Sequence, residues 1–391
     1  MRRLDNPVRR YAWGSTEVIP KLLGVAPDGE PQAELWIGAH ERDSSRLDGV
    51  DLAGLVAADP GRYLGARFAG EHRLPFLAKV IAVAEPLSLQ VHPDSRLAAA
   101  GFAAEEAAAV DRDSPLRTYP DDLAKVEMVY AMSPFKALCG FRPVDDLVGW
   151  LDVLDLPVLA PTLASVRRFG AAALSTEAER LLTGIDPGAA VAQIESRCAA
   201  LADDPDWGWS AAMLGEVARH YPDDAAVSLA VLLQPHLLAP GQCLLVRPGQ
   251  PHTYLGGTAF EVQANSDNTI RAGLTTKHVD VDLLLTALHT QGVPPVAAVV
   301  AYDEGAERVF APDTPRFALS VVTGPAGALG VTLTDVPGPE VFCCLDGGFA
   351  VSDDEAGVEL RAGQAAFAAA DGGAVRVSGR GTLLRVTAGR A

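Results

Sequence analysis

The chain has 391 residues, a formal net charge of −18, and five cysteines whose spacings form neither a zinc knuckle nor a disulfide ladder. Its acidic balance and its lack of Lys- or Arg-rich runs argue against nucleic acid and against an anionic membrane surface as partners. The length predicts two or three domains. We expect a cytoplasmic protein, because no apolar segment of a signal peptide follows Arg2 and Arg3 and no apolar run reaches the roughly 18 residues of a membrane span.

The first 96 residues have the texture of an all-β protein. Short runs rich in β-branched and aromatic residues occupy 34–37, 75–83 and 87–91, and Gly, Pro and Asp separate them. An Ala-rich segment over 97–109 then interrupts this pattern with a helical composition.

The pattern becomes helical between residues 144 and 234. Apolar residues three and four positions apart predict helices over 144–154, 176–182 and 189–201. Thr176 followed by Glu179 has the form of a capping box, which predicts that the second of these helices begins at Thr176. We interpret the segment as a helical insertion.

The β texture returns at about residue 236, with strands expected over 242–247 and 259–263. A Pro-containing stretch at 292–295 separates a last block of short strands and Gly-rich turns, in which adjacent Cys343 and Cys344 point to opposite faces of a strand. We expect a mainly β fold with an α insertion. Its units are residues 1–143 together with 235–292, the insertion 144–234, and a second β-barrel or sandwich over 293–391.

Polar residues alternate along the strand expected at 87–91. Ser88, Gln90 and His92 project to one face while Leu87, Leu89 and Val91 project to the other. Imidazole is a common zinc ligand and a Gln carbonyl oxygen is an unusual one. The row is therefore either part of a metal site or a solvated polar face.

A second stretch, residues 241–257, runs from a strand into a Pro-Gly turn, and His252 follows three residues after Gly249. This turn is similar to the second half of the cupin metal pattern, in which a histidine points into a barrel; a structural histidine is the alternative. A third stretch has turn chemistry at 266–268 and the cations Arg271 and Lys277 just beyond it. Such cations suit a phosphate or an enediolate, and a solvated loop is the alternative.

Seven blocks together resemble type I phosphomannose isomerases in order and approximate spacing. The resemblance extends from about residue 5 to 290, and the last block fits the C-terminal cupin-like domain of that family by position. The blocks are Trp13-Gly14, 34–38 (ELWIG), 90–94 (QVHPD), 125–128 (KVEM), 137–143 (ALCGFRP), 251–255 (PHTYL) and 266–275 (SDNTIRAGLT).

The resemblance implies a cupin fold, one zinc ion per chain and the interconversion of mannose 6-phosphate and fructose 6-phosphate. Carried over position by position, it assigns the zinc ligands to Gln90, His92, Glu127 and His252. It makes Arg271 the active-site arginine. It implies a small-molecule sugar phosphate as the substrate, and it implies no protein partner. The other positions that it places around the sugar and its phosphate are Trp13, Glu34, Lys79, Ser88, Lys125, Glu261, Asp267 and Lys277.

One departure from the family pattern affects the expected chemistry. Where the family reads N-H-K-P-E-M, this chain has Leu123, Ala124 and Lys125, so that the family histidine is Ala124. A scheme in which that histidine opens the ring or moves a proton cannot operate unchanged. Likewise, Ala12 stands where many relatives have an Asp before Trp-Gly.

Isomerisation of an aldose to a ketose needs a base for the C2 proton and a way to stabilise the enediolate oxygens. We expect Arg271 to stabilise that anion, and we leave the proton carrier open among Glu261, Asp267 and Lys125. Two rival functions remain: a non-catalytic cupin that binds metal and senses a sugar phosphate, and an isomerase of a related sugar. The remaining histidines are expected to be surface or structural residues (His40, His72, His220, His236, His278 and His289).

Overall fold

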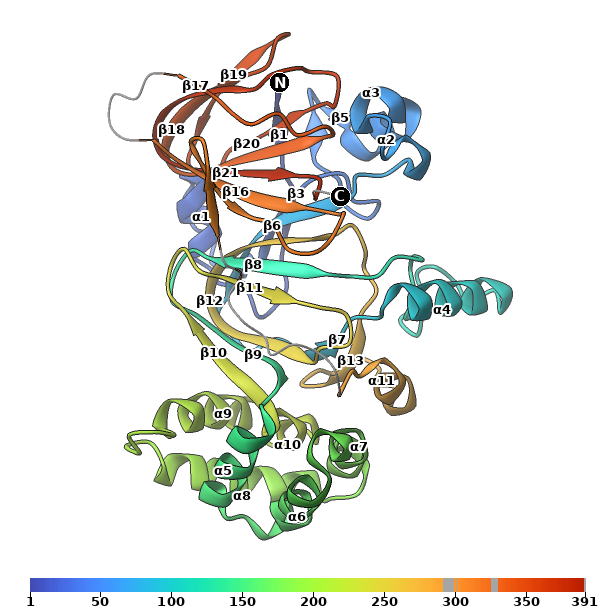
Figure 1. Cartoon of the computed structure of the whole chain (residues 1–391), viewed down its shortest axis with the longest axis vertical. Coiled ribbons are helices and arrows are strands. Elements are labelled where there is room, and N and C mark those ends of the chain that lie inside the picture. The colour runs from blue at the N-terminus through green and yellow to red at the C-terminus, as the bar shows by residue number, and fades with distance from the viewer. Residues whose placement is uncertain (291–298, 300, 325–329, 390–391) are drawn as a thin grey trace.

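The computed structural model describes residues 1–290, 299, 301–324 and 330–389. Three layers are stacked along its long axis: a helical unit at one end, a β-barrel in the middle and a second β-barrel at the other end (Figure 1). The expected mainly β fold with a helical insertion is confirmed. The predicted boundary at 292–293 lies outside the described residues.

The middle layer, called the first barrel here, is an antiparallel sheet built around the long strand β12. β12 pairs with four strands, namely β6 and β8 along its second half and β7 and β9 along its first half. The described strands of this barrel are β2 (Val8–Arg9), β3 (Glu34–Ile37), β6 (Phe76–Val83), β7 (Leu89–Val91), β8 (Glu127–Ala131), β9 (Phe135–Phe141), β10 (Leu233–Leu238), β11 (Cys243–Val246), β12 (His252–Ala264) and β13 (Ile270–Gly273).

The second barrel contains the C-terminal strands and, in addition, three strands from the first 51 residues. β1 pairs with β20 through Arg2↔Phe367, and β4 pairs with β1. Its described strands are β1 (Arg2–Asp5), β4 (Arg46–Leu47), β5 (Val50–Asp51), β14 (Tyr302–Glu304), β15 (Glu307–Phe310), β16 (Ala318–Gly324), β17 (Val331–Thr332), β18 (Glu340–Ser352), β19 (Gly357–Arg361), β20 (Ala365–Ala368) and β21 (Arg376–Thr387). The predicted unit 1–143 therefore contributes strands to both barrels, while the division into units itself stays a prediction.

The helical unit packs against the first barrel, next to β9 and β10 (Figure 1). Its apolar core is continuous with barrel residues such as Leu89, Val91 and Ile270. Six helices form the unit: α5 (Val144–Leu154), α6 (Ala160–Phe169), α7 (Leu174–Thr183), α8 (Pro187–Ala200), α9 (Gly208–His220) and α10 (Ala226–Ala230). The other described helices are α1 (Val18–Leu23), α2 (Leu52–Ala58), α3 (Pro60–Leu64), α4 (Ser95–Ala107) and α11 (Val281–Ala287).

The local predictions fit most elements and miss two details. The capping box is wrong: a 3₁₀ turn over Gly170–Ala173 runs directly into α7, so that Thr176 lies inside the helix and its side chain caps nothing. The alternation expected along 87–91 holds from Ser88 onward, whereas Leu87 lies before β7 and faces the cavity described below. Cys343 and Cys344 do pack in different apolar clusters, as their adjacency on a strand predicts.

Candidate active site

Strand register brings three sequence-distant residues together at the mouth of the first barrel. His252 on β12 lies opposite Gln90 on β7, and Gln90 in turn lies opposite Arg271 on β13. Directly paired residues of antiparallel strands project to the same face. The register therefore aims Gln90, His252 and Arg271 into one region.

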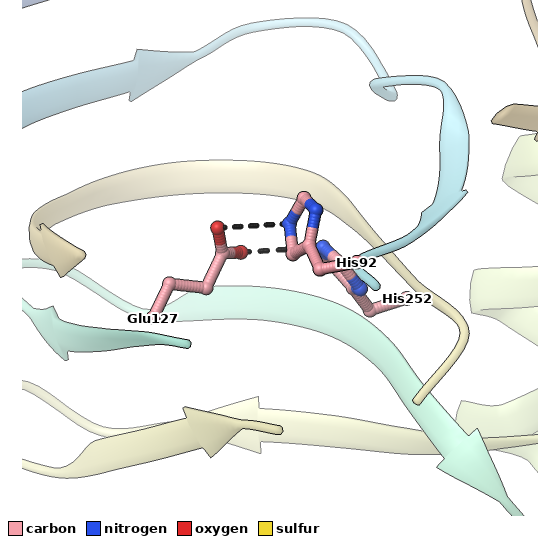
Figure 2. A group of neighbouring side chains, drawn as sticks. All are labelled: His92, Glu127 and His252. Carbon is pink, nitrogen blue, oxygen red and sulfur yellow. Dashed lines mark hydrogen bonds and ion pairs between the residues drawn. The ribbon is translucent and has the colours of Figure 1, made fainter. Parts of the chain in front are cut away.

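Two histidines and a carboxylate meet inside the barrel. One ligand atom from each of His92, Glu127 and His252 lies within 4.8 Å of the others, and all three side chains are buried (Figure 2). Nε2 of His92 is 3.1 Å from Oε2 of Glu127, and Nε2 of His252 is 3.2 Å from its Oε1. This is the donor set and spacing that a zinc ion prefers.

Backbone carbonyls fix the orientation of both imidazoles. Nδ1 of His92 donates to the carbonyl of Asn268 at 2.9 Å, and Nδ1 of His252 donates to the carbonyl of Gln250 at 3.1 Å. A proton held on Nδ1 leaves the lone pair of Nε2 free for a metal, the arrangement typical of metal-binding histidines. The predicted ligand Gln90 is adjacent, with its side-chain amide 3.3 Å from Nε2 of His252.

The electrostatics of this group also favour a metal. Burial alone would raise the pKa of Glu127, but the charge of Lys125 holds it well below its ordinary value. Burial, together with the charge of Lys125, lowers the pKa of His92 to about 3, so that its ring stays neutral. An ionised carboxylate beside neutral imidazoles is the protonation state that metal binding requires.

A cavity of about 690 Å³ opens from this group to solvent. Eleven of the thirteen site residues predicted from the sequence line it; His92 and His252 lie fully buried behind its wall. The eleven are Trp13, Glu34, Lys79, Ser88, Gln90, Lys125, Glu127, Glu261, Asp267, Arg271 and Lys277.

A row of paired side chains crosses the inner face of the barrel. Trp36 on β3 lies opposite Lys79 on β6, and Lys79 lies opposite Glu261 on β12. Nζ of Lys79 is 3.1 Å from Glu261 and 3.9 Å from Glu34. Burial alone would lower the pKa of Lys79, but these carboxylates raise it, so that the ammonium stays charged. Burial raises the pKa of Glu261 despite the neighbouring Lys79.

The cations of the cavity differ in how they are paired. Lys79 and Lys125 are held by carboxylates, since Nζ of Lys125 is 3.1 Å from Oε2 of Glu127. Arg271 and Lys277, by contrast, make no ion pair with any carboxylate in the part of the chain that the structure describes. These two lining residues therefore have positive charge available for an anion.

Sequence reasoning missed two contacts of the site. The hydroxyl of Tyr254 donates to Oε1 of Glu127 at 2.8 Å, although Tyr254 lies in the same block as His252. His40, which was expected to be a surface or structural residue, is buried. Its Nε2 is 3.3 Å from Asp267, which Arg42 also approaches to 3.2 Å. His40 follows the 34–38 block by two residues, and that proximity was the available signal.

The pairing of Asp267 separates it from Glu261 as a proton carrier. Burial alone would raise the pKa of Asp267, but the hydrogen bond from His40 and the charge of Arg42 lower it strongly. Asp267 is therefore a weak base, whereas the raised pKa of Glu261 brings that carboxyl closer to the range of a general base.

The fold and this donor set define a β-barrel protein with a metal-binding group and an anion-accepting cavity. The family model described as phosphomannose isomerase type I, catalytic domain, matches residues 1–144. The mannose-6-phosphate isomerase of Salmonella typhimurium is 35% identical over 99% of this chain and 99% of its own length, and that of Escherichia coli is 34% identical with the same coverage. The chain belongs to the type I mannose-6-phosphate isomerases.

Solved structures agree with this assignment over the full length. A crystal structure of mannose 6-phosphate isomerase from Salmonella typhimurium bound to fructose 6-phosphate and zinc superposes with a TM-score of 0.89, covers 100% of both chains and is 33% identical. A structure of mannose 6-phosphate isomerase bound with zinc and yttrium has the same TM-score and identity. Among the described helices, none is both long enough and apolar enough to cross a membrane.

Proposed function

We propose that this chain interconverts D-mannose 6-phosphate and D-fructose 6-phosphate at a zinc site held by His92, Glu127 and His252, with Gln90 as the fourth ligand. The observation that carries the proposal is the buried His–Glu–His group at the end of a cavity that also presents two unpaired cations. Zinc, when bound there, supplies a positive charge that polarises the O1 and O2 oxygens of the sugar.

Arg271 lies beside the metal end of the cavity, because β13 pairs it with Gln90. It is half-buried, and no carboxylate among the described residues neutralises it. A guanidinium in this position stabilises negative charge as it develops on the sugar oxygens. The phosphate group of the substrate is bound by Lys277, which is exposed and lines the cavity, and by the hydroxyl of Ser88, which lies directly before β7.

Glu261 is the proton carrier that the geometry favours. It removes the proton from C2 and returns it to C1, so that the carboxyl begins and ends the cycle ionised. Lys79 holds the ionised carboxylate in place at 3.1 Å. Trp13 and Glu34 line the same cavity and complete the contacts to the sugar hydroxyls.

All of these groups are present even though Ala124 replaces the family histidine. Ala124 is half-buried and is not among the residues that line the cavity, whereas its neighbours Lys125 and Glu127 are. Ring opening in this chain therefore does not use position 124. We also propose a cytoplasmic location, since all five cysteines are free thiols and buried.

The test is a coupled assay on mannose 6-phosphate with protein of measured zinc content, before and after chelation. We expect turnover to fall with the metal and to return when zinc is added back. Mannose without its phosphate is the matched substrate, and we expect a rate lower by at least about a hundredfold, because Lys277 and Ser88 then have no ligand. Metal-loaded protein without turnover would favour a sensor instead.

A further inference from the structure

The connection between α9 and α10 touches both walls of the cavity. The hydroxyl of Tyr221 donates to the carbonyl of Pro86 at 2.7 Å, just before Ser88. Three residues later, Oδ2 of Asp224 accepts from the backbone N–H of Leu274 at 2.6 Å, between Arg271 and Lys277. A turn of the helical unit is thus attached to the two segments that carry the proposed phosphate contacts.

The segment held by Asp224 has an unusual backbone. Leu274 has φ of 54°, a left-handed conformation that is rare for a side chain branched at Cγ and costs of order 1 kcal/mol. Gly273 has φ of 148°, and a Cβ at that position would lie 2.4 Å from Cβ of Ala226 and 2.6 Å from Oδ1 of Asp224. Both residues adopt these conformations where the chain presses directly against the turn.

Asp224 supports the turn and the cavity wall at the same time. Its Oδ1 accepts from the N–H of Ala226 at 2.9 Å, at the start of α10, while its Oδ2 accepts from Leu274. One carboxylate therefore uses both oxygens to join the helical unit to the end of β13. Hydrogen bonds to a charged acceptor are stronger than those between neutral groups.

The two unpaired cations depend on this contact to different degrees. Arg271 lies within β13, whose pairing with Gln90 on β7 fixes it. Lys277 lies four residues beyond the end of β13, and its segment is attached through Leu274 to Asp224 and through a local hydrogen bond from its N–H to Oγ1 of Thr275. Loss of the Asp224 contact would release Lys277 and leave Arg271 in place.

We propose that Asp224 is a positioning residue through which the helical unit sets the phosphate contact of Lys277. The inference rests on the proposed function of Lys277, and the helical unit then contributes to substrate recognition without itself contacting the reacting carbons. Tyr221 steadies the opposite wall through Pro86.

The test compares Asp224→Asn and Asp224→Ala with Asp223→Asn, an exposed neighbour for which the structure records no hydrogen bond. For the Asp224 variants, we expect the KM for mannose 6-phosphate and the Ki of inorganic phosphate to rise about tenfold, while kcat stays within about twofold and the zinc content is unchanged. Asp224→Asn is informative if the alanine variant folds poorly, because an amide oxygen can still serve one of the two N–H groups.

Two outcomes overturn the proposal. One is an unchanged Ki of phosphate in both Asp224 variants, and the other is a parallel loss of kcat and zinc, which a general loss of structure would produce. Lys277→Ala tests the phosphate role of Lys277 separately from the positioning role of Asp224. If Lys277→Ala leaves the Ki of phosphate unchanged, then the phosphate assignment itself is wrong. If both assignments hold, Asp224→Ala adds little to the Ki in the Lys277→Ala background.

Discussion

The two barrels both bury charged side chains, but they neutralise them in different ways. In the first barrel, His92, Glu127 and His252 converge on one point beside an open cavity. In the second barrel, the guanidinium of Arg385 lies between two carboxylates: its Nε donates to Glu340 at 2.6 Å, and its NH1 donates to Glu307 at 2.8 and 2.9 Å.

Each guanidinium nitrogen of Arg385 has a hydrogen-bond partner within this cluster. The remaining nitrogen of Arg385 donates to the carbonyl of Thr334 at 2.8 Å, and the side chains of Arg385 and Glu307 are both 2% exposed. Burial raises the pKa of Glu340 even though Arg385 opposes the shift. A closed cluster of this kind has no free ligand position, whereas in the first barrel both imidazole Nε2 atoms face Glu127, and Glu127 itself lines the cavity. One fold type thus supports a reactive site in one barrel and a structural ion cluster in the other.

The largest effect is expected from removing one of the proposed zinc ligands in the first barrel. His92→Ala removes a buried donor, and we expect zinc content near zero and a loss of turnover of at least about a thousandfold, because several kcal/mol of charge stabilisation depend on the metal. Metal analysis and the coupled assay measure both. His72→Asn is the control, since His72 is exposed, lies outside the cavity and has a positive φ that Asn tolerates. An active, zinc-loaded His92→Ala protein would contradict the assignment.

The second prediction breaks the ion cluster of the second barrel. Arg385→Leu leaves Glu307 and Glu340 buried without their cation, and we expect a loss of about 3–5 kcal/mol in the free energy of unfolding. The turnover of the folded fraction should remain near that of the unchanged chain, because the cluster lies in the other barrel. Denaturant titration gives the stability. Arg376→Ala, which breaks an exposed pair with Asp354, is the control and should change it little.

The third prediction tests the proton carrier. Glu261→Gln keeps the size of the side chain and its distance from Lys79 but removes the base, and we expect kcat to fall about a hundredfold or more with zinc retained. Exchange of the C2 proton with solvent deuterium should fall in parallel. Glu355→Gln, on the surface of the second barrel, should have no effect. If exchange persists in Glu261→Gln, then Lys125 or another group carries the proton.

The pH dependence sharpens the same assignment. A general base works in its ionised form, which exists above its pKa, and burial raises the pKa of Glu261 above the ordinary 4.5. We therefore expect kcat/KM to fall on the acid side at a pH above 4.5, by about tenfold for each further unit. An acid limb below 4.5 would instead indicate a carboxyl like Asp267, whose pKa is lowered.

The smallest expected effect concerns the departure from the family pattern. Ala124→His restores the family residue, and we expect kcat/KM to change by less than about threefold, because position 124 lies outside the cavity wall and the proposed roles are filled by other groups. Steady-state kinetics of the variant decide the matter. A gain of tenfold or more would show that the missing imidazole limits this chain.

Much of the first barrel was predictable because its evidence is local. Gln90 lies on the short strand β7 and His92 directly follows it, and the turn before His252 precedes the second histidine. The convergence of Lys79, Glu261 and Trp36 across three strands is not visible in any window of sequence, because it depends on strand register. The same is true of the contact between His40 and Asp267.

Other features could not be predicted because tertiary structure overrides local preference. Thr176 and Glu179 have capping chemistry, but the 3₁₀ turn before α7 is packed into the helical core and begins the helix earlier. β4 and β5 have two residues each, too short to show a period, and their strand character comes from tertiary pairing: β4 pairs with β1, and β5 pairs with β4.

That pairing of β1 has a consequence for how the chain acquires its structure. β1 and β20 are separated by most of the chain, as the pair Arg2↔Phe367 shows. Their contact therefore closes a very long loop. On the ribosome, the described strands of the first barrel are synthesised by Gly273, long before β20 emerges. We therefore expect the first barrel to form while the edge of β1 that pairs with β20 is still exposed, even though β4 can already pair with the other edge of β1.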